Sequence, residues 1–314
     1  MSHTVIRRTE MVGASLNLGG QPLDLTEYST TGLMALAVGP RGFGKTNAGL
    51  LMAEQLSEQG WVSVLIDPEG ELESVYGAAV ADAEELRQRL TLRDVPIVVV
   101  SAKDALDFIP YGQVILEVAD ELRKPLFVCI DEGQLFSAAR KRADGVGEAC
   151  DIIAQFAERG RKRALDLFVT ALRYTGTLHR TMFSNPNLKL IGAQEDPTAW
   201  SALAPMFRSS GIEFKDLNAL GPGEFVLFSR RGIEKTKMPM AEGLKKVAPK
   251  AKPVKRTLPA TFSQWDRAMR EIPTERLEAL TDPVVSLLGA VAGLVPQQML
   301  AGARALGDEL EARA

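Results

Sequence analysis

Residues 33–51 read LMALAVGPRGFGKTNAGLL, and this stretch decides the fold. Its first six residues are apolar and predict a buried strand. Residues 39–46 then match the pattern G-x-x-x-x-G-K-[ST], and residues 45–59 show the apolar spacing of a helix. A strand, a glycine-rich loop and a helix in this order are the context in which the pattern forms a phosphate-binding loop. The stretch therefore predicts a P-loop that binds a nucleotide.

The residues of this loop have distinct predicted roles. Glycines let backbone N–H groups approach phosphate oxygens, and the helix that follows presents further free N–H groups to the same anion. Lys45 is expected to reach the β- and γ-phosphate oxygens, and the Thr46 hydroxyl to ligate Mg²⁺. The expected cofactors are therefore ATP and Mg²⁺. The predicted nucleotide-binding residues in the loop are Gly39, Pro40, Arg41, Gly42, Phe43, Gly44, Lys45, Thr46 and Asn47.

The composition is that of an ordinary globular chain. The 314 residues include 40 acidic and 37 basic ones, for a net charge of −3, and 46% are hydrophobic. This balance excludes a disordered chain and a strongly basic nucleic-acid tail. The two cysteines predict buried thiols in a reducing compartment, and no apolar stretch approaches the roughly 20 residues that a membrane helix needs. We therefore expect a cytoplasmic protein without a membrane segment.

Apolar runs alternate with helical patterns over most of residues 33–228. Continuous apolar strands separated by helices predict a parallel sheet that is covered on both faces, with ligands bound beyond the carboxyl ends of the strands. A short hairpin is expected before the sheet, around Gly19 and Gly20. The expected strands are 33–38, 62–66, 96–100, 126–130, 166–171, 188–191 and 225–228. The expected helices between them are 45–59, 81–90, 113–122 and 146–158.

Residues 126–132, LFVCIDE, form the second chemical motif. Five apolar residues that end in two acids are typical of a Walker B strand. Asp131 is then expected to hold Mg²⁺, and Glu132 to polarise the attacking water. An isolated Asp-Glu pair is usually a solvated loop, but the apolar strand before this pair favours the catalytic interpretation. The second acid is typical of hydrolytic motor ATPases.

Two further motifs leave alternatives open. Asp67, in IDPEGE at residues 66–71, follows another predicted strand and either assists the water or metal, or simply forms a turn. The basic run ERGRKR at residues 158–163 ends a helix. It is either a basic helix end that the helix dipole favours, or it carries an arginine finger that enters a neighbouring subunit's nucleotide site.

Together these motifs resemble the HerA/FtsK superfamily of hexameric P-loop motors, and HerA-like ATPases most closely. The resemblance covers roughly residues 15–240. The matching segments, in family order, are GPRGFGKTNAGLLMAEQL, LIDPEGEL, LFVCIDEGQLF, AERGRKRALDLFVTALR and NPNLKLIGAQED. The resemblance implies an α/β fold of the RecA-like (ASCE) P-loop type, with a mainly parallel sheet flanked by helices. It also implies a homo-oligomeric ring that hydrolyses ATP and translocates double-stranded DNA.

The same resemblance implies roles for single residues. The implied catalytic residues are Lys45, which contacts phosphate, Glu132, which shares the Walker B role with Asp131, Asp67 as an accessory acid, and Arg161 as the leading arginine-finger candidate. Thr46 and Asp131 would hold Mg²⁺. The family usually has Ala-Thr-Gln-Arg after the strand that follows Walker B, whereas residues 170–173 here read TALR. Arg173 is retained and is expected to contact phosphate, but Leu172 cannot sense a γ-phosphate by hydrogen bonding.

Two other departures bear on function. About 30 residues before the predicted motor are too few for the β-barrel of HerA. Residues 243–256 hold six basic and no acidic residues and predict an exposed linker, and residues 257–314 predict a helical tail. We thus expect a P-loop ATPase domain at 1–242, a basic linker and a small helical region. The alternative to a DNA motor is a regulatory or scaffold ATPase that assembles with a partner such as a nuclease or a secretion or virion component. A catalytically weak nucleotide-binding protein is a third possibility.

Overall fold

A computed structural model describes residues 14–138, 144–174, 176 and 178–246 of the chain. These residues all belong to one compact unit, Met1–Ala248. The predicted tail at 257–314 and most of the predicted linker at 243–256 lie outside the described residues, so their limits stay predictions. In the described ranges, no helix combines the length and the apolar character that a membrane crossing requires.

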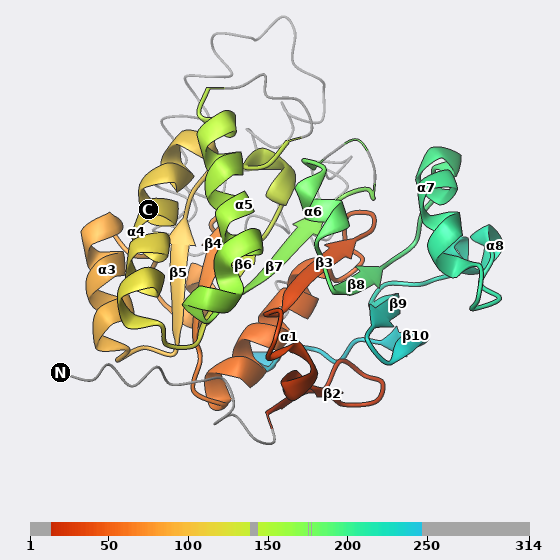
Figure 1. The fold of residues 1–314 in the computed structure, drawn as a ribbon, viewed down its shortest axis with the longest axis horizontal. Helices are drawn as coiled ribbons and strands as arrows, with labels where there is room; N and C mark the ends of the chain where they lie inside the picture. The colour runs from red at the N-terminus through yellow and green to blue at the C-terminus, as the bar shows by residue number, and fades with distance from the viewer. Residues whose placement is uncertain (1–13, 139–143, 175, 177, 247–314) are drawn as a thin grey trace, which may run out of the picture. The chain divides into compact units, whose positions relative to one another are not determined.

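An eight-stranded mixed sheet forms the centre of the described unit (Figure 1). The strands β8, β3, β7, β6, β4 and β5 lie in this order and run parallel, and the hairpin of β9 and β10 extends the sheet antiparallel beside β8. The sheet strands are β3 (Met34–Val38), β4 (Val62–Asp67), β5 (Ile97–Ser101), β6 (Leu126–Ile130), β7 (Leu165–Ala171), β8 (Leu188–Ile191), β9 (Glu224–Ser229) and β10 (Gly232–Lys237). The predicted parallel sheet is therefore confirmed.

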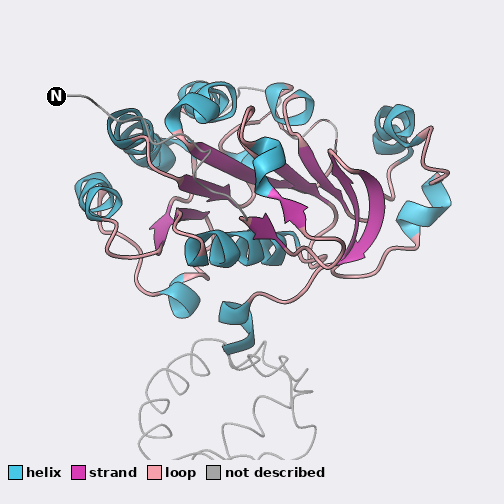
Figure 2. Cartoon of the chain, turned by 60° about the horizontal axis from the view of Figure 1, so that its bottom comes forward, coloured by secondary structure: helices cyan, strands magenta, loops and turns pink. Residues whose placement is uncertain are grey.

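Helices cover both faces of this sheet (Figure 2). The N-terminal hairpin, β1 (Ser15–Leu16) with β2 (Leu23–Asp24), is also present as predicted. Short 3-10 turns occur at Leu25–Tyr28 and Gly133–Leu135. The helices are α1 (Lys45–Glu58), α2 (Glu73–Tyr76), α3 (Ala83–Leu92), α4 (Ala105–Leu122), α5 (Val146–Arg163), α6 (Thr181–Ser184), α7 (Pro197–Phe207), α8 (Phe214–Asn218) and α9 (Glu242–Lys246).

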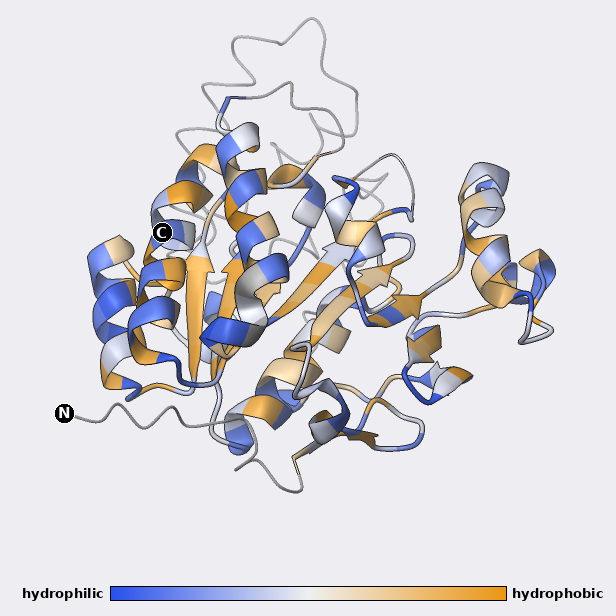
Figure 3. Ribbon diagram, in the orientation of Figure 1, coloured by the Kyte–Doolittle hydropathy of each residue, from blue (hydrophilic) through white to orange (hydrophobic). Residues whose placement is uncertain are grey.

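The alternation of side chains along β3 divides the core into two layers. Leu36 and Val38 pack in the layer that holds α3, α4 and α5, whereas Ala35 and Ala37 face α1. Small side chains let α1 lie close to the sheet. A Cβ at Gly49 of α1 would stand 2.6 Å from Cys129 Sγ, so this helix position has room only for glycine. In Figure 3 the strands are hydrophobic and the outward helix faces are mostly hydrophilic.

Several elements differ from the expectations. The helix predicted at 113–122 begins at Ala105, because Asp104 caps it and Pro110 lies inside it without ending it. The helix predicted at 146–158 continues to Arg163. Strand β10 and helices α7 and α8 had no clear apolar pattern and were not predicted. The first residues of the predicted linker form part of α9, with Gly243 N–H donating to Glu54 Oε1.

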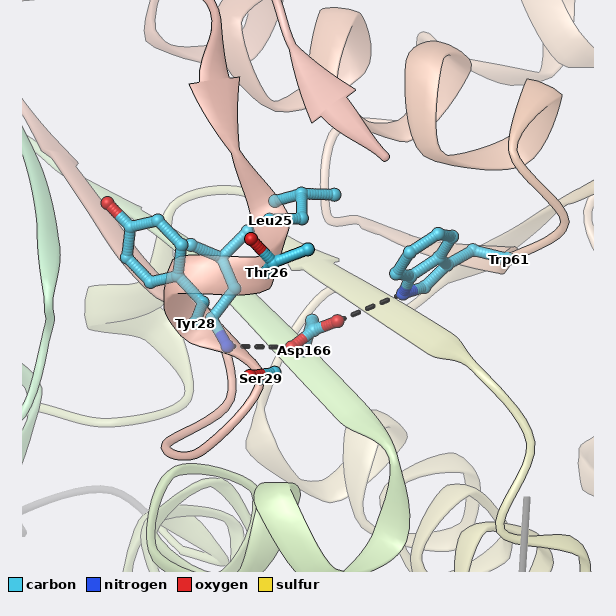
Figure 4. A pocket seen from close by; sticks show the side chains of 7 residues that line it. Leu25, Thr26, Tyr28, Ser29, Trp61 and Asp166 are labelled. Atoms are coloured by element: carbon cyan, nitrogen blue, oxygen red, sulfur yellow. Dashed lines mark hydrogen bonds between the residues drawn. The ribbon is translucent and has the colours of Figure 1, made fainter. Parts of the chain in front are cut away.

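Asp166 joins the starts of three strands (Figure 4). The residue is 3% exposed on β7, and its carboxylate accepts a 2.7 Å hydrogen bond from Leu33 N–H, just before β3. Its second oxygen accepts a 2.9 Å bond from the indole Nε1 of Trp61, just before β4. A pocket of about 20 Å³ beside it is lined in part by Tyr28. Because burying a carboxylate is costly unless it is hydrogen-bonded, these two donors explain its place in the core.

We expect Asp166→Ala to lower the free energy of unfolding by about 2–4 kcal/mol, because it leaves two buried donors without an acceptor. Urea unfolding followed by circular dichroism measures the loss. The matched control is Asp94→Ala, at an exposed aspartate, which should change stability by about 0.5 kcal/mol or less. Equal effects of the two substitutions would contradict the anchoring role of Asp166.

Candidate nucleotide-binding site

The P-loop, the acidic pair and the TALR segment meet at the carboxyl ends of neighbouring strands. Strands β3, β7 and β6 are neighbours and parallel, with Val38 paired to Ala171 and Ile130 paired to Val169. Their carboxyl ends therefore lie side by side, and the P-loop, residues 170–173 and the acidic pair follow directly from them. Along the chain, β5 lies between the P-loop and the acidic pair Asp131–Glu132. In the sheet, however, β5 is an outermost strand, and β7 is the strand that lies between β3 and β6.

The P-loop backbone takes conformations that require glycine. Gly42 has φ of +75°, and Gly44, which caps α1, has φ of +86°. The loop is also supported from outside, because Phe43 O accepts a 3.0 Å hydrogen bond from Gly223 N–H. A Cβ at Gly44 would stand 3.5 Å from Gly223 Cα. The turn before β9 thus packs against the P-loop, a contact that no sequence signal indicated.

Lys45 places a buried cation within the loop. Its side-chain Nζ donates a 2.9 Å hydrogen bond to Pro40 O, and the residue is 9% exposed. Burial lowers the pKa of Lys45, and the negative charges of Asp131 and Glu132 act in the opposite direction. An ammonium in this position can transfer its hydrogen bond from the loop carbonyl to a phosphate oxygen.

Asp131 is held by two hydroxyl groups from different elements. Thr46 Oγ1 donates a 2.8 Å hydrogen bond to Asp131 Oδ2, and Thr170 Oγ1 donates a 2.6 Å bond to Asp131 Oδ1. A threonine hydroxyl beside a carboxylate fits Mg²⁺, which is usually bound by one or two protein oxygens together with phosphate oxygens and water. No cluster of three or more metal-ligating side chains occurs in the described part of the chain. The donor set therefore suits a metal bound jointly with a phosphate.

Glu132 adopts a left-handed backbone conformation, with φ of +46° and ψ of +48°. For a residue with a Cβ this costs on the order of 1–2 kcal/mol. Its N–H donates a 2.9 Å hydrogen bond to Thr170 Oγ1, and its Oε1 lies 4.0 Å from Nη2 of Arg41, whose side chain is 80% exposed. The acid thus lies near the P-loop, and its role in hydrolysis stays a prediction.

Asp67 is engaged in a turn. Its Oδ1 accepts backbone hydrogen bonds from Glu69 at 3.2 Å and Gly70 at 3.1 Å, and its Oδ2 accepts one from Leu72 at 2.7 Å. The residue is 3% exposed at the end of β4, the neighbour of β6. These contacts correspond to the turn interpretation, and the role of an accessory acid stays a prediction.

Asn47 binds a distant part of the chain. Its side-chain Nδ2 donates a 2.8 Å hydrogen bond to Pro239 O, and its Oδ1 accepts a 2.9 Å bond from Ala241 N–H. On the same helix, Glu54 accepts hydrogen bonds from the backbone N–H groups of Glu242 and Gly243. Helix α1 therefore holds residues 239–243, and a nucleotide contact of Asn47 stays a prediction.

Arg173 lies at the same edge as the P-loop. A pocket of about 240 Å³ is lined by Pro40, Leu172, Arg173, Ala193, Gln194, Glu195 and Asp196. Arg173 Nη1 is 3.8 Å from Asp196 Oδ2 at its rim. Two polar residues of the site were not predicted from the sequence. Gln194, which is 4% exposed, lines this pocket, and Thr170 lies near the acidic pair. Both follow apolar runs near strand ends, and that position was the available signal.

Arg161 is not brought to the site within one chain. It lies in the last turns of α5, and a single residue, Ala164, joins α5 to the amino end of β7. The P-loop follows the carboxyl end of β3, which runs parallel to β7, so the two positions lie at opposite edges of the sheet. The side chain of Arg161 lies outside the described part, and its finger role stays a prediction.

The side chains of the basic run at residues 158–163 differ in their exposure and contacts. Arg163 is 6% exposed, and its guanidinium binds Asp120 through two hydrogen bonds, Nε to Oδ1 at 2.5 Å and Nη2 to Oδ2 at 2.6 Å. Lys162 is exposed. Arg163 therefore joins α5 to α4. Elsewhere, Cys129 and Cys150 are buried free thiols, as predicted, and burial raises the pKa of Cys129 well above its usual value.

No protein-family model and no curated protein matches the chain. Solved structures do. VirB4 of Thermoanaerobacter pseudethanolicus superposes with a TM-score of 0.56 at 13% identity, over 73% of this chain and 98% of that one. The genome packaging NTPase B204 from Sulfolobus turreted icosahedral virus 2, in complex with ATP-gammaS, gives a TM-score of 0.52 at 14% identity, over 66% and 98% of the two chains.

A third neighbour is the pCW3 conjugation coupling protein TcpA in a monomer form with ATPgS, with a TM-score of 0.53 at 14% identity, over 78% of this chain and 70% of that one. The chain has a P-loop ATPase fold. The RecA-like arrangement that the sequence predicted is thereby confirmed, and these neighbours agree with the HerA/FtsK resemblance at the level of the fold.

We expect Asn47→Ala to release residues 239–241 from the P-loop helix while nucleotide affinity stays unchanged. Loss of a buried amide pair should destabilise this segment by about 1–3 kcal/mol, seen as faster hydrogen exchange at Ala241. Asn218→Ala, at an exposed asparagine, is the control for exchange. Weaker binding of an ATP analogue with unchanged exchange at Ala241 would instead support the nucleotide contact predicted from the sequence.

Proposed function

We propose that the protein is an ATP hydrolase that works as a ring and translocates double-stranded DNA. The observation that carries the ATPase part is the hydrogen-bonded group of Thr46 and Asp131, with Glu132 beside it and a P-loop lysine facing it. Phosphoryl transfer to water requires these four groups: a hydroxyl, a metal-binding carboxylate, a second acid and a cation. Nucleotide complexes of the structural neighbours support the same proposal.

Binding is assigned to the loop and to α1. The backbone N–H groups of residues 42–46 and the amino end of α1 receive the β- and γ-phosphates. Lys45 then donates to their oxygens instead of to Pro40. Thr46 and Asp131 hold Mg²⁺, which supplies positive charge to the phosphate oxygens when it is bound.

Hydrolysis is assigned to Glu132. Its carboxylate orients a water molecule in line with the bond between the γ-phosphorus and the bridging oxygen and accepts a proton from it. The new bond joins the water oxygen to the γ-phosphorus, the bridging bond breaks, and ADP and phosphate are released. Arg41, which lies 4.0 Å from Oε1 of Glu132, keeps the carboxylate close to the loop until a phosphate is bound.

We expect Glu132→Gln to bind ATP normally and to hydrolyse it about 100-fold or more slowly, because the amide cannot accept the proton. Lys45→Ala should lose nucleotide binding. The matched control is Glu69→Gln at a nearby exposed acid, which should hydrolyse ATP at the normal rate. Nucleotide affinity and steady-state phosphate release measure the three variants. Unchanged turnover in Glu132→Gln would contradict the proposed role.

The proposed ring and the proposed DNA substrate rest on other observations than the proposed ATPase activity does. Arg161 lies at the sheet edge opposite its own P-loop, so it can reach a nucleotide only in a neighbouring copy. Two structural neighbours are named as a genome packaging NTPase and a conjugation coupling protein. The run at 243–256, with six basic and no acidic residues, offers the positive charge that duplex phosphates need. We assign the DNA contact to these residues in the assembled ring.

We expect Arg161→Ala to be inactive alone and to recover part of its activity when mixed with Lys45→Ala. In mixed rings an intact P-loop in one subunit can then face an intact Arg161 from the next. Lys162→Ala, in the same turn of α5, is the control and should hydrolyse ATP without a partner. A mixture that assembles but stays inactive would contradict the finger.

A partner-assembling scaffold ATPase is the second candidate. Leu172 favours it, because an apolar side chain lines the pocket beside Pro40 where a phosphate-sensing amide would couple hydrolysis to movement. The partner would be a nuclease or a secretion or virion component. The two candidates differ in their response to DNA. A motor hydrolyses ATP faster on duplex DNA, and its binding weakens steeply with salt, whereas a scaffold does neither.

A further inference from the structure

We propose that Thr170 is the positioning residue that aims Glu132 at the water, so that hydrolysis depends on its hydroxyl and nucleotide binding does not. This inference rests on the proposed ATPase function. Thr170 lies in the segment TALR, where the sequence departs from the family pattern. No nucleotide contact is needed for this role, since Thr170 acts on the two acids at the end of β6.

The Thr170 hydroxyl is fully used by the acidic pair. It donates its hydrogen to Asp131 Oδ1 at 2.6 Å and accepts the Glu132 N–H at 2.9 Å. Thr170 is 0% exposed, so water cannot replace either bond. One oxygen atom on β7 therefore holds the backbone that carries the base, whereas the metal-binding carboxylate keeps its other hydrogen bond, from Thr46, when the Thr170 hydroxyl is removed.

The register of the strands puts the hydroxyl there. Ile130 of β6 pairs with Val169 of β7, so Asp131 and Thr170 are the next residues along their strands. Alternation places Thr170 on the same face as Phe168, the face that packs on α1. Thr46 at the start of α1 contacts the other carboxylate oxygen of Asp131. The pair is thus held between α1 and β7.

The Thr170 hydroxyl matters for the position of Glu132 because the backbone of Glu132 is strained. A left-handed conformation at a residue with a Cβ persists only when surrounding contacts hold it. The bond from Glu132 N–H to Thr170 Oγ1 is made by the strained residue itself. Without that acceptor, the peptide can rotate toward an ordinary conformation, and the side chain then leaves the position from which it reaches the water.

Three substitutions at this position separate the hydroxyl from the shape of the side chain. Thr170→Val keeps the size and removes the hydroxyl, whereas Thr170→Ser keeps the hydroxyl. We expect Thr170→Val to lower kcat about tenfold or more at saturating Mg²⁺, with KM and ATP affinity nearly unchanged. Thr170→Ser should restore kcat. Thr170→Ala reports whether the deleted methyl group matters separately, and it should be as slow as Thr170→Val.

A buried threonine outside the site provides the matched control. Thr236 of β10 is 6% exposed, and its hydroxyl donates to Leu18 O at 2.7 Å. Thr236→Val loses one buried hydrogen bond and should retain the normal kcat. Thermal unfolding of each variant reports whether the fold is intact. If Thr236→Val slows hydrolysis as much as Thr170→Val does, the effect is one of stability and the proposal is wrong.

A double variant tests whether Thr170 acts through Glu132. In the Glu132→Gln background, Thr170→Val should cause no further loss of kcat, because the base is already gone. An equal loss in both backgrounds, a parallel loss of kcat and ATP affinity, or a Thr170→Ser variant as slow as Thr170→Val would overturn the proposal. If the unaltered protein hydrolyses no ATP, the proposed ATPase function fails. If it hydrolyses ATP and Thr170→Val is equally fast, only the role of Thr170 fails, so the two failures are distinguishable.

Discussion

The site depends on three parallel strands that end together at one edge of the sheet. Each of β3, β7 and β6 carries a different part of the site, and none could operate alone. Asp131, at the end of β6, connects these elements, because its two carboxylate oxygens accept hydrogen bonds from one hydroxyl of α1 and one of β7. A shift of β7 against β6 by one residue would turn Thr170 to the opposite face and break this connection. The strand register is therefore as much a condition for the site as the side chains are.

The two edges of the sheet have different charge and different partners. The carboxyl edge carries the P-loop, the acidic pair and Arg173, and its cation Lys45 is buried among negative charges. At the amino edge, Asp166 joins the strand starts, and the basic end of α5 is tied down by Arg163 and Asp120. A single chain thus brings Arg41 and Arg173 to the carboxyl edge and leaves Arg161 at the opposite edge.

The sequence predicted the elements whose signals are local. The apolar strands, the P-loop helix and the acidic strand end all follow from periodicity or from a motif with a required context. Pro110 concealed the first half of α4, since a proline inside a helix suggests an end, although the Asp104 cap marks the true start. The hydrogen-bond partners of Asn47 lie about 190 residues away, so no local pattern could indicate them, and its predicted contact with the nucleotide stays a prediction. Thr170 could not be singled out, because its role depends on a strand register and on the backbone angle of Glu132.

The grip of α1 on residues 239–243 has a mechanical meaning. The helix that presents its amino end to the phosphates also fastens, through Asn47 and Glu54, the stretch from which the remaining chain departs. A pulling force on the chain after residue 246 therefore acts first on α1, at its first and third turns, where Asn47 and Glu54 make these hydrogen bonds.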